Sequence, residues 1–120
     1  MIKKMPKIIA VDFDNTLSIG EYKYPACGVF NKELAHYIVS EQLNGAIIIL
    51  NTCRVGIALV NAISFCRLNG LCFDYVNENS IEAIELMNGD CRKIFANEYI
   101  DDRNVFNKDW NIYKKEIINE

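Results

Sequence analysis

An apolar run that ends in two closely spaced carboxylates constrains this chain more than any other stretch. Ile8–Val11 is rich in β-branched residues, and a run of this length and composition predicts a strand buried on both faces. Asp12 and Asp14 follow it directly. Ligands bind beyond the carboxyl ends of the strands in an open α/β sheet, so both acids are expected at a binding site. Because neighbouring carboxylates repel each other and lose hydration, we expect a cation or hydrogen-bond donors beside them.

Predicted strands and helices alternate along the rest of the chain. The further strands are expected at 46–50 and 71–76, with a short late one at 99–100. The helices are expected at about 31–43, 56–69 and 81–87, and from about Asp109 onward. Residues 18–29 show neither the helical nor the strand spacing of apolar residues, and they are expected to form a loop over the end of the first strand. This alternation predicts an α/β fold, a three-layer doubly wound sheet that is mostly parallel.

Composition restricts the class of protein further. With 120 residues, of which 51% are hydrophobic and 24% charged, the chain 1–120 is expected to form one compact soluble domain. The net charge of −3 leaves no overall excess of basic residues to bind nucleic acid. No apolar run approaches the roughly 20 residues that cross a bilayer, and the start has no secretory signal pattern. The five cysteines include no C-x-x-C pair, which favours reduced thiols, most of them in the core, and a cytoplasmic location.

Polar residues follow three of the predicted strands. Thr52 lies just after the strand at 46–50, Asp101 and Asp102 end the late strand, and Lys93 lies a little upstream of them. Parallel strands end at one edge, so these groups are expected beside Asp12. A divalent cation would neutralise the carboxylates and clamp a phosphate oxygen, while the hydroxyl donates to the phosphate and the lysine offsets charge. The set therefore indicates phosphoryl transfer.

The same residues resemble a known family. The DFDNTL sequence of Asp12–Leu17 looks like motif I of the haloacid dehalogenase-like (HAD) hydrolases, D-x-D-x-T-L. IIILNTCR resembles motif II with Thr52, RKIFA resembles motif III with Lys93, and YIDDR resembles motif IV with Asp101 and Asp102. The four motifs occur in the family's order and frame nearly the whole chain. More narrowly, the chain is similar to a group of small, capless HAD hydrolases of largely undefined substrate.

The resemblance implies a catalytic role for each matching residue. Asp12 would be the nucleophile that forms an aspartyl-phosphate. Asp14 would protonate the leaving group and then activate the attacking water. Thr52 would hydrogen-bond the transferring phosphoryl group, and Lys93 would stabilise the nucleophile and the phosphate.

The resemblance also implies a metal site and an open active site. Mg²⁺ would be held by Asp12, by the backbone carbonyl of Asp14, by Asp101, and by Asp102 directly or through water. Only about a dozen loop residues separate Leu17 from the first helix, and core elements use up the chain between Thr52 and Lys93, so no cap domain fits. The substrate is then expected to be a phosphorylated small molecule or the phosphorylated end of a macromolecule. An oligomer in which a second subunit covers the site remains open.

Several neighbouring residues allow two interpretations. Asn15 stands where the family most often has glycine, and asparagine also accepts turn conformations, so it is counted with the phosphate-binding residues. Cys53 would supply a backbone N–H to the phosphate or act as a redox-sensitive thiol. Arg54 would bind the phosphate or begin a solvated helix. Either Lys93 or the adjacent Arg92 would point into the site.

Two other functions compete with a phosphatase. One is a catalytically silent module of the same fold that binds phosphate or metal, or regulates, although a silent copy need not keep both acids of motif I. The other is a receiver-like signalling domain, whose phosphorylated aspartate lies at the end of the third strand. Here that strand holds Asp74 before the apolar Val76, which disfavours a receiver.

Overall fold

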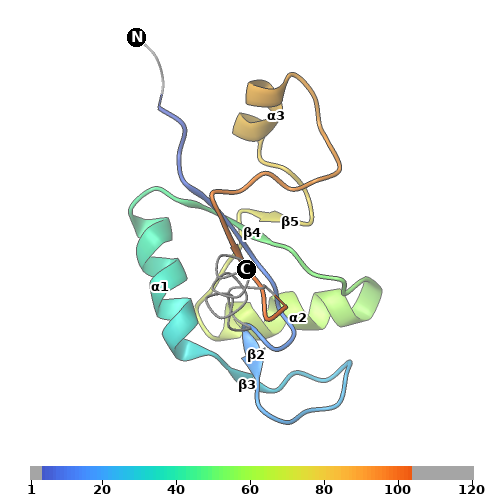
Figure 1. Ribbon diagram of the computed structural model, residues 1–120. Helices are drawn as coiled ribbons and strands as arrows, with labels where there is room; N and C mark the ends of the chain where they lie inside the picture. The colour runs from blue at the N-terminus through green and yellow to red at the C-terminus, as the bar shows by residue number, and fades with distance from the viewer. Residues whose placement is uncertain (1–3, 104–120) are drawn as a thin grey trace, which may run out of the picture.

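A computed structural model describes residues 4–103 and shows a mixed α/β fold around one parallel sheet (Figure 1). The sheet has the order β5-β4-β1-β6, and each of its pairings is parallel. Its strands are β1 (Ile8–Val11), β4 (Ile47–Leu50), β5 (Tyr75–Val76) and β6 (Glu98–Ile100). The α/β class and the mostly parallel sheet expected from the sequence are therefore confirmed.

Strand β1 lies in the middle of the sheet and brings three strand ends together. All four of its residues are buried, as the apolar run predicts. Beyond its end, the Asp12 N–H donates to the Ile100 carbonyl of β6 at 2.9 Å. On the other side, the Asn51 N–H that follows β4 donates to the Val11 carbonyl at 2.8 Å. The residues that follow β1, β4 and β6 consequently meet at one edge of the sheet.

Three helices complete the described part of the fold, and their bounds follow the sequence expectation closely. They are α1 (Lys32–Leu43), α2 (Gly56–Leu68) and α3 (Ile81–Met87). The Asn31 side chain caps α1 by accepting from the Leu34 N–H at 3.2 Å, and Ser80 caps α3 through the Ala83 N–H at 3.2 Å. No helix within residues 4–103 is long and apolar enough to cross a membrane.

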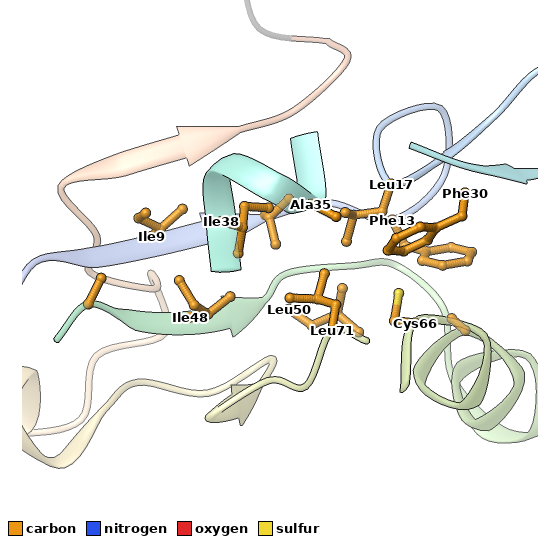
Figure 2. Close-up of a cluster of buried hydrophobic side chains, with 13 residues drawn as sticks. Ile9, Phe13, Leu17, Phe30, Ala35, Ile38, Ile48, Leu50, Cys66 and Leu71 are labelled. Carbon is orange, nitrogen blue, oxygen red and sulfur yellow. The ribbon is translucent and has the colours of Figure 1, made fainter. Parts of the chain in front are cut away.

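Side chains that alternate along the strands divide the core into two clusters. The larger cluster joins β1 and β4 to α1 and α2, and it contains among others Ile9, Val11, Ile48, Leu50, Ala35, Ile38, Ala62 and Cys66, several of which Figure 2 shows. The smaller cluster joins the other side of the same strands to α3 through Ile8, Ile49 and Ala83. Both sides of β1 are therefore covered, which explains why its sequence is a continuous apolar run.

The expected loop between β1 and α1 contains a hairpin that sequence periodicity did not predict. Strands β2 (Ser18–Ile19) and β3 (Val29–Phe30) pair antiparallel. The Gly28 N–H donates to the Ser18 hydroxyl at 2.7 Å, and a Cβ at Gly28 would lie 2.4 Å from the Tyr22 ring. Two-residue strands are too short to show an alternating pattern, so the close approach at Gly28 is the physical feature that marks the hairpin.

Two further predicted elements, one strand and one helix, do not match the structure as directly. The strand expected at 71–76 is limited to β5, because this edge segment pairs only with the end of β4. The helix expected from about Asp109 lies outside the described residues.

The positions of the cysteines differ in part from the sequence expectation. Within residues 4–103 all five thiols are free, as expected. The expectation that most of them fill the core is wrong, because only Cys66 is buried, Cys27 is half-buried, and Cys53, Cys72 and Cys91 are exposed.

Candidate functional site

The edge where β1, β4 and β6 end carries a hollow of about 590 Å³, a size typical of small-ligand sites. The residues that line it come from the three strand ends and from the segment that precedes β3: Asp12, Asp14, Asn15, Tyr22, Tyr24, Asn51, Thr52, Cys53, Asp101, Asp102 and Arg103. A larger hollow, of about 800 Å³, surrounds Pro6 and Lys7 before β1 and holds none of the predicted site residues. Of the residues predicted for the site, all but Arg54 and Lys93 therefore line the first hollow.

Three carboxylates form a cluster in this hollow. One oxygen from each of Asp12, Asp101 and Asp102 lies within 4.8 Å of the others, and all three residues are half-buried. The pKa of Asp12 is raised to about 6, first by burial and then by the nearby Asp101 and Asp102, although the Phe13 N–H that donates to it at 2.8 Å acts in the opposite direction. The cluster is thus anionic and incompletely hydrated.

The donor set fits a hard divalent cation. Mg²⁺ binds oxygen ligands at about 2.0–2.1 Å, so opposite ligands lie about 4.2 Å apart. Adjacent ligands lie about 2.9 Å apart, so oxygens up to 4.8 Å apart would approach one another by as much as about 2 Å to share one ion, a shift that rotation of the half-buried side chains allows.

The Asp14 side chain has different partners from the cluster. Arg54 donates to both of its oxygens, from Nε to Oδ2 at 2.9 Å and from Nη2 to Oδ1 at 2.8 Å. The Tyr22 hydroxyl donates to Oδ1 at 2.8 Å. These donors, Arg54 above all, hold the pKa of Asp14 below its usual range, although burial acts against them. Asp14 is therefore an ionised and fully hydrogen-bonded carboxylate in this arrangement.

Arg54 is a buried structural group and does not line the hollow. It is 1% exposed, and each of its five N–H groups has an acceptor. Besides the two bonds to Asp14, Nη1 donates to the carbonyls of Pro25 at 2.8 Å and Ala58 at 3.2 Å, and Nη2 donates to that of Ala26 at 2.9 Å. No donor remains for a phosphate, so the expectation that Arg54 binds one is corrected. The guanidinium instead ties the end of motif I and the start of α2 to the segment before β3.

Thr52 lies in a turn after β4, where both its backbone and its side chain are hydrogen-bonded. Its N–H donates to the side chain of Asn77 at 2.8 Å, and its hydroxyl oxygen accepts from the Arg54 N–H at 3.2 Å. The hydroxyl proton is therefore directed elsewhere and is available to a ligand. Cys53 is exposed and lines the hollow beside Thr52, and both interpretations of it, as a backbone N–H donor or as a redox-sensitive thiol, stay predictions.

Asn15 also lines the hollow, in the turn that follows Asp14. Its φ of 60° is left-handed, which asparagine tolerates better than most residues. Its N–H donates to the Tyr22 hydroxyl at 3.2 Å, so the turn and the tyrosine support each other.

The predicted lysine lies outside the hollow. Lys93 is exposed, and its Nζ lies 5.8 Å from the centroid of the Tyr99 ring. Neither Lys93 nor Arg92 is among the lining residues, which corrects the expectation that one of them points into the site. Among the described residues that line the hollow, the basic one is Arg103, whose backbone N–H donates to Asp101 at 2.9 Å. Sequence reasoning missed Arg103, although its position directly after the acid pair was a usable signal.

Comparison with known proteins identifies one solved relative. The structure is similar to that of a conserved protein from Bacteroides thetaiotaomicron, with a TM-score of 0.71 and 34% sequence identity over 96% of this chain and 92% of the other. No model of a known protein family matches the chain, and no curated protein matches it. The description of the Bacteroides protein names no activity. At this identity over nearly the full length of both chains, the protein belongs to the same family as the conserved Bacteroides protein.

Proposed function

We propose that the protein is a Mg²⁺-dependent phosphatase that hydrolyses phosphate monoesters through an aspartyl-phosphate on Asp12. The observation that carries the proposal is the cluster at the edge of the sheet, where oxygens of Asp12, Asp101 and Asp102 lie within 4.8 Å of one another. The finer fold description, a three-layer, doubly wound, capless domain of the HAD type, belongs to the same proposal. The free thiols fit a reducing compartment such as the cytoplasm.

The metal would be held by Asp12, Asp101 and Asp102, with the Asp14 carbonyl as a further ligand. When bound, Mg²⁺ supplies a Lewis acid that neutralises the carboxylates and polarises a phosphate oxygen. The remaining charge of the phosphate would be met by the Thr52 hydroxyl and the Arg103 guanidinium, since both residues line the hollow.

The reaction would proceed as two displacements at phosphorus. A carboxylate oxygen of Asp12 forms a bond to phosphorus, the ester P–O bond breaks, and the departing alkoxide takes up a proton. Water then attacks the phosphorus of the aspartyl-phosphate, which releases inorganic phosphate and restores Asp12. Covalent catalysis of this kind divides one difficult hydrolysis into two easier steps.

The contacts of Asp14 favour a second candidate. A carboxylate that accepts three hydrogen bonds and has a lowered pKa is a weak base, and at neutral pH it carries no proton to give to a leaving group. In the phosphatase, Asp14 would have to leave Arg54 to protonate the leaving group. If it never does so, the same site binds Mg²⁺ and phosphate without turnover, as a catalytically silent module.

Turnover of a phosphate-ester panel separates the two candidates. Hydrolysis should require Mg²⁺, stop with a chelator, and fall by at least about 100-fold in Asp12→Asn. Asp90→Asn is the matched control, because Asp90 is exposed, lies outside the hollow and accepts only from Asn79. Calorimetric binding of Mg²⁺ without hydrolysis of any ester would establish the silent module, and equal rates in wild type and Asp12→Asn would exclude Asp12 as the nucleophile.

A further inference from the structure

Tyr24 is a large aromatic side chain that is fixed on one side and open on the other. Its ring lies over the Arg54 guanidinium, 4.9 Å from centroid to Cζ. Arg54 itself is held by its five hydrogen bonds and by the Phe13 ring at 4.7 Å, so it is a rigid support. Tyr24 is nevertheless 58% exposed and lines the hollow that contains the carboxylate cluster.

The hollow extends well beyond what a phosphate needs. At about 590 Å³ it has the volume of a site for a small organic ligand. The phosphate end of a ligand would occupy the part near Asp12 and Thr52, and the remaining wall includes Tyr22 and Tyr24. The part of a substrate that is not phosphate would therefore meet tyrosine rings.

We infer that the substrate carries a planar, unsaturated ring next to its phosphate ester, and that this ring stacks on Tyr24. The inference rests on the proposed function, because the site for the phosphate sets which part of the hollow the ring occupies. It narrows the substrate class to aryl, arylmethyl or heterocyclic phosphates.

The physical reason is the stack that already exists. An arginine that lies against one face of an aromatic ring leaves the other face available for a second flat ring, so a guanidinium, a tyrosine and a ligand ring form a continuous layer. Four carboxylates in the same hollow disfavour ligands with further negative charge. A neutral ring on a single phosphate satisfies both conditions.

Two non-hydrolysable phosphonates test the stacking without relying on turnover. Benzylphosphonate and cyclohexylmethylphosphonate carry the same charged group and a six-membered ring on the same linker, and differ in whether the ring is aromatic. Titration calorimetry with Mg²⁺ gives their affinities for wild type, Tyr24→Phe and Tyr24→Leu. Tyr24→Phe keeps the ring and is the matched control, and Tyr24→Leu removes it at a mostly exposed position.

The expected result is that wild type and Tyr24→Phe bind benzylphosphonate about two- to tenfold more tightly than cyclohexylmethylphosphonate. Tyr24→Leu should lose that preference while it binds the cyclohexyl compound as wild type does. Equal affinity of wild type for the two phosphonates, or a preference that survives in Tyr24→Leu, would overturn the inference. Binding with the expected preference but no hydrolysis of any ester would refute the phosphatase and leave the ring specificity standing.

Discussion

Replacement of Arg54 by methionine is the perturbation whose consequence the structure defines most clearly. Arg54 is 1% exposed and all five of its N–H groups are used, two of them by the carboxylate of Asp14. Methionine fills much of the same volume and donates no hydrogen bond. We expect Arg54→Met to lower the free energy of unfolding by about 3–4 kcal/mol at neutral pH.

The magnitude comes from the groups that lose their donors. Removal of one partner of a buried ion pair costs about 3–5 kcal/mol. The Asp14 side chain is 30% exposed, so water replaces part of the lost interaction and the estimate lies toward the lower end of that range. The carbonyls of Pro25 and Ala26 belong to exposed residues and regain water. Arg54→Lys keeps the charge without the planar fork, and about 2 kcal/mol is expected for it.

Urea denaturation followed by circular dichroism measures both changes. Arg67→Met is the matched control, because Arg67 lies on the same helix α2 but is exposed, and about 0.5 kcal/mol or less is expected there. A double-mutant cycle with Asp14→Asn should give a coupling energy of about 1–3 kcal/mol between the two side chains.

The pH dependence adds a second readout. The lowered pKa of Asp14 stabilises the native protein above the ordinary carboxyl value of 3.8, and this contribution is lost as the pH falls through the lower native pKa. The stability difference between wild type and Arg54→Met should therefore shrink in acid. An Arg54→Met protein that is as stable as Arg67→Met at neutral pH would refute the reasoning, because the five hydrogen bonds would then contribute nothing.

Three further predictions concern the metal, the hairpin and the lysine. Asp12 must lose its proton to bind Mg²⁺ and its pKa is raised to about 6, so Mg²⁺ affinity in titration calorimetry should rise with pH through about 6 and then level off; a constant affinity from pH 5 to about 8 would contradict this. Gly28→Ala should lower the free energy of unfolding by about 1–3 kcal/mol, because its Cβ would lie 2.4 Å from both the Ile19 carbonyl oxygen and the Tyr22 ring, whereas Gly89→Ala meets nothing within 4 Å and serves as the control. Lys93→Met should leave kcat/KM within about twofold of wild type in steady-state assays, since Lys93 lies outside the hollow, and a loss of about 100-fold would restore it to the site.

The parts of the fold that the sequence predicted are those set by local chemistry. The short β-branched run at Ile8–Val11 predicts a strand that is buried on both faces, and the helix between it and the next run predicts parallel pairing. Asn31 and Ser80 mark the first turns of α1 and α3, because their short side chains accept hydrogen bonds from backbone N–H groups there. The acids that end β1 and β6 meet because parallel neighbouring strands end at one edge, so Asp12 and Asp101 were predictable neighbours.

The parts that were missed depend on contacts between distant residues. Arg54 bonds to Asp14 across 40 positions and to carbonyls of the segment before β3, and no sequence period records such a contact. The position of Lys93 follows from the loop between α3 and β6, where Asn79 accepts from the Phe95 N–H at 2.7 Å and donates to the Lys93 carbonyl at 3.1 Å. Loop geometry of this kind decides which way a side chain points, and a motif match does not specify it.

Chemical trapping of the covalent intermediate tests the central claim most directly. Borohydride reduces an acyl phosphate to an alcohol, so a phosphorylated Asp12 would be converted to homoserine and recognised by peptide mass spectrometry. We predict homoserine at position 12 when the protein turns over a phosphate ester with Mg²⁺, and none when a chelator replaces the metal. Release of inorganic phosphate while Asp12 stays unmodified, or reduction at a different aspartate, would contradict the account.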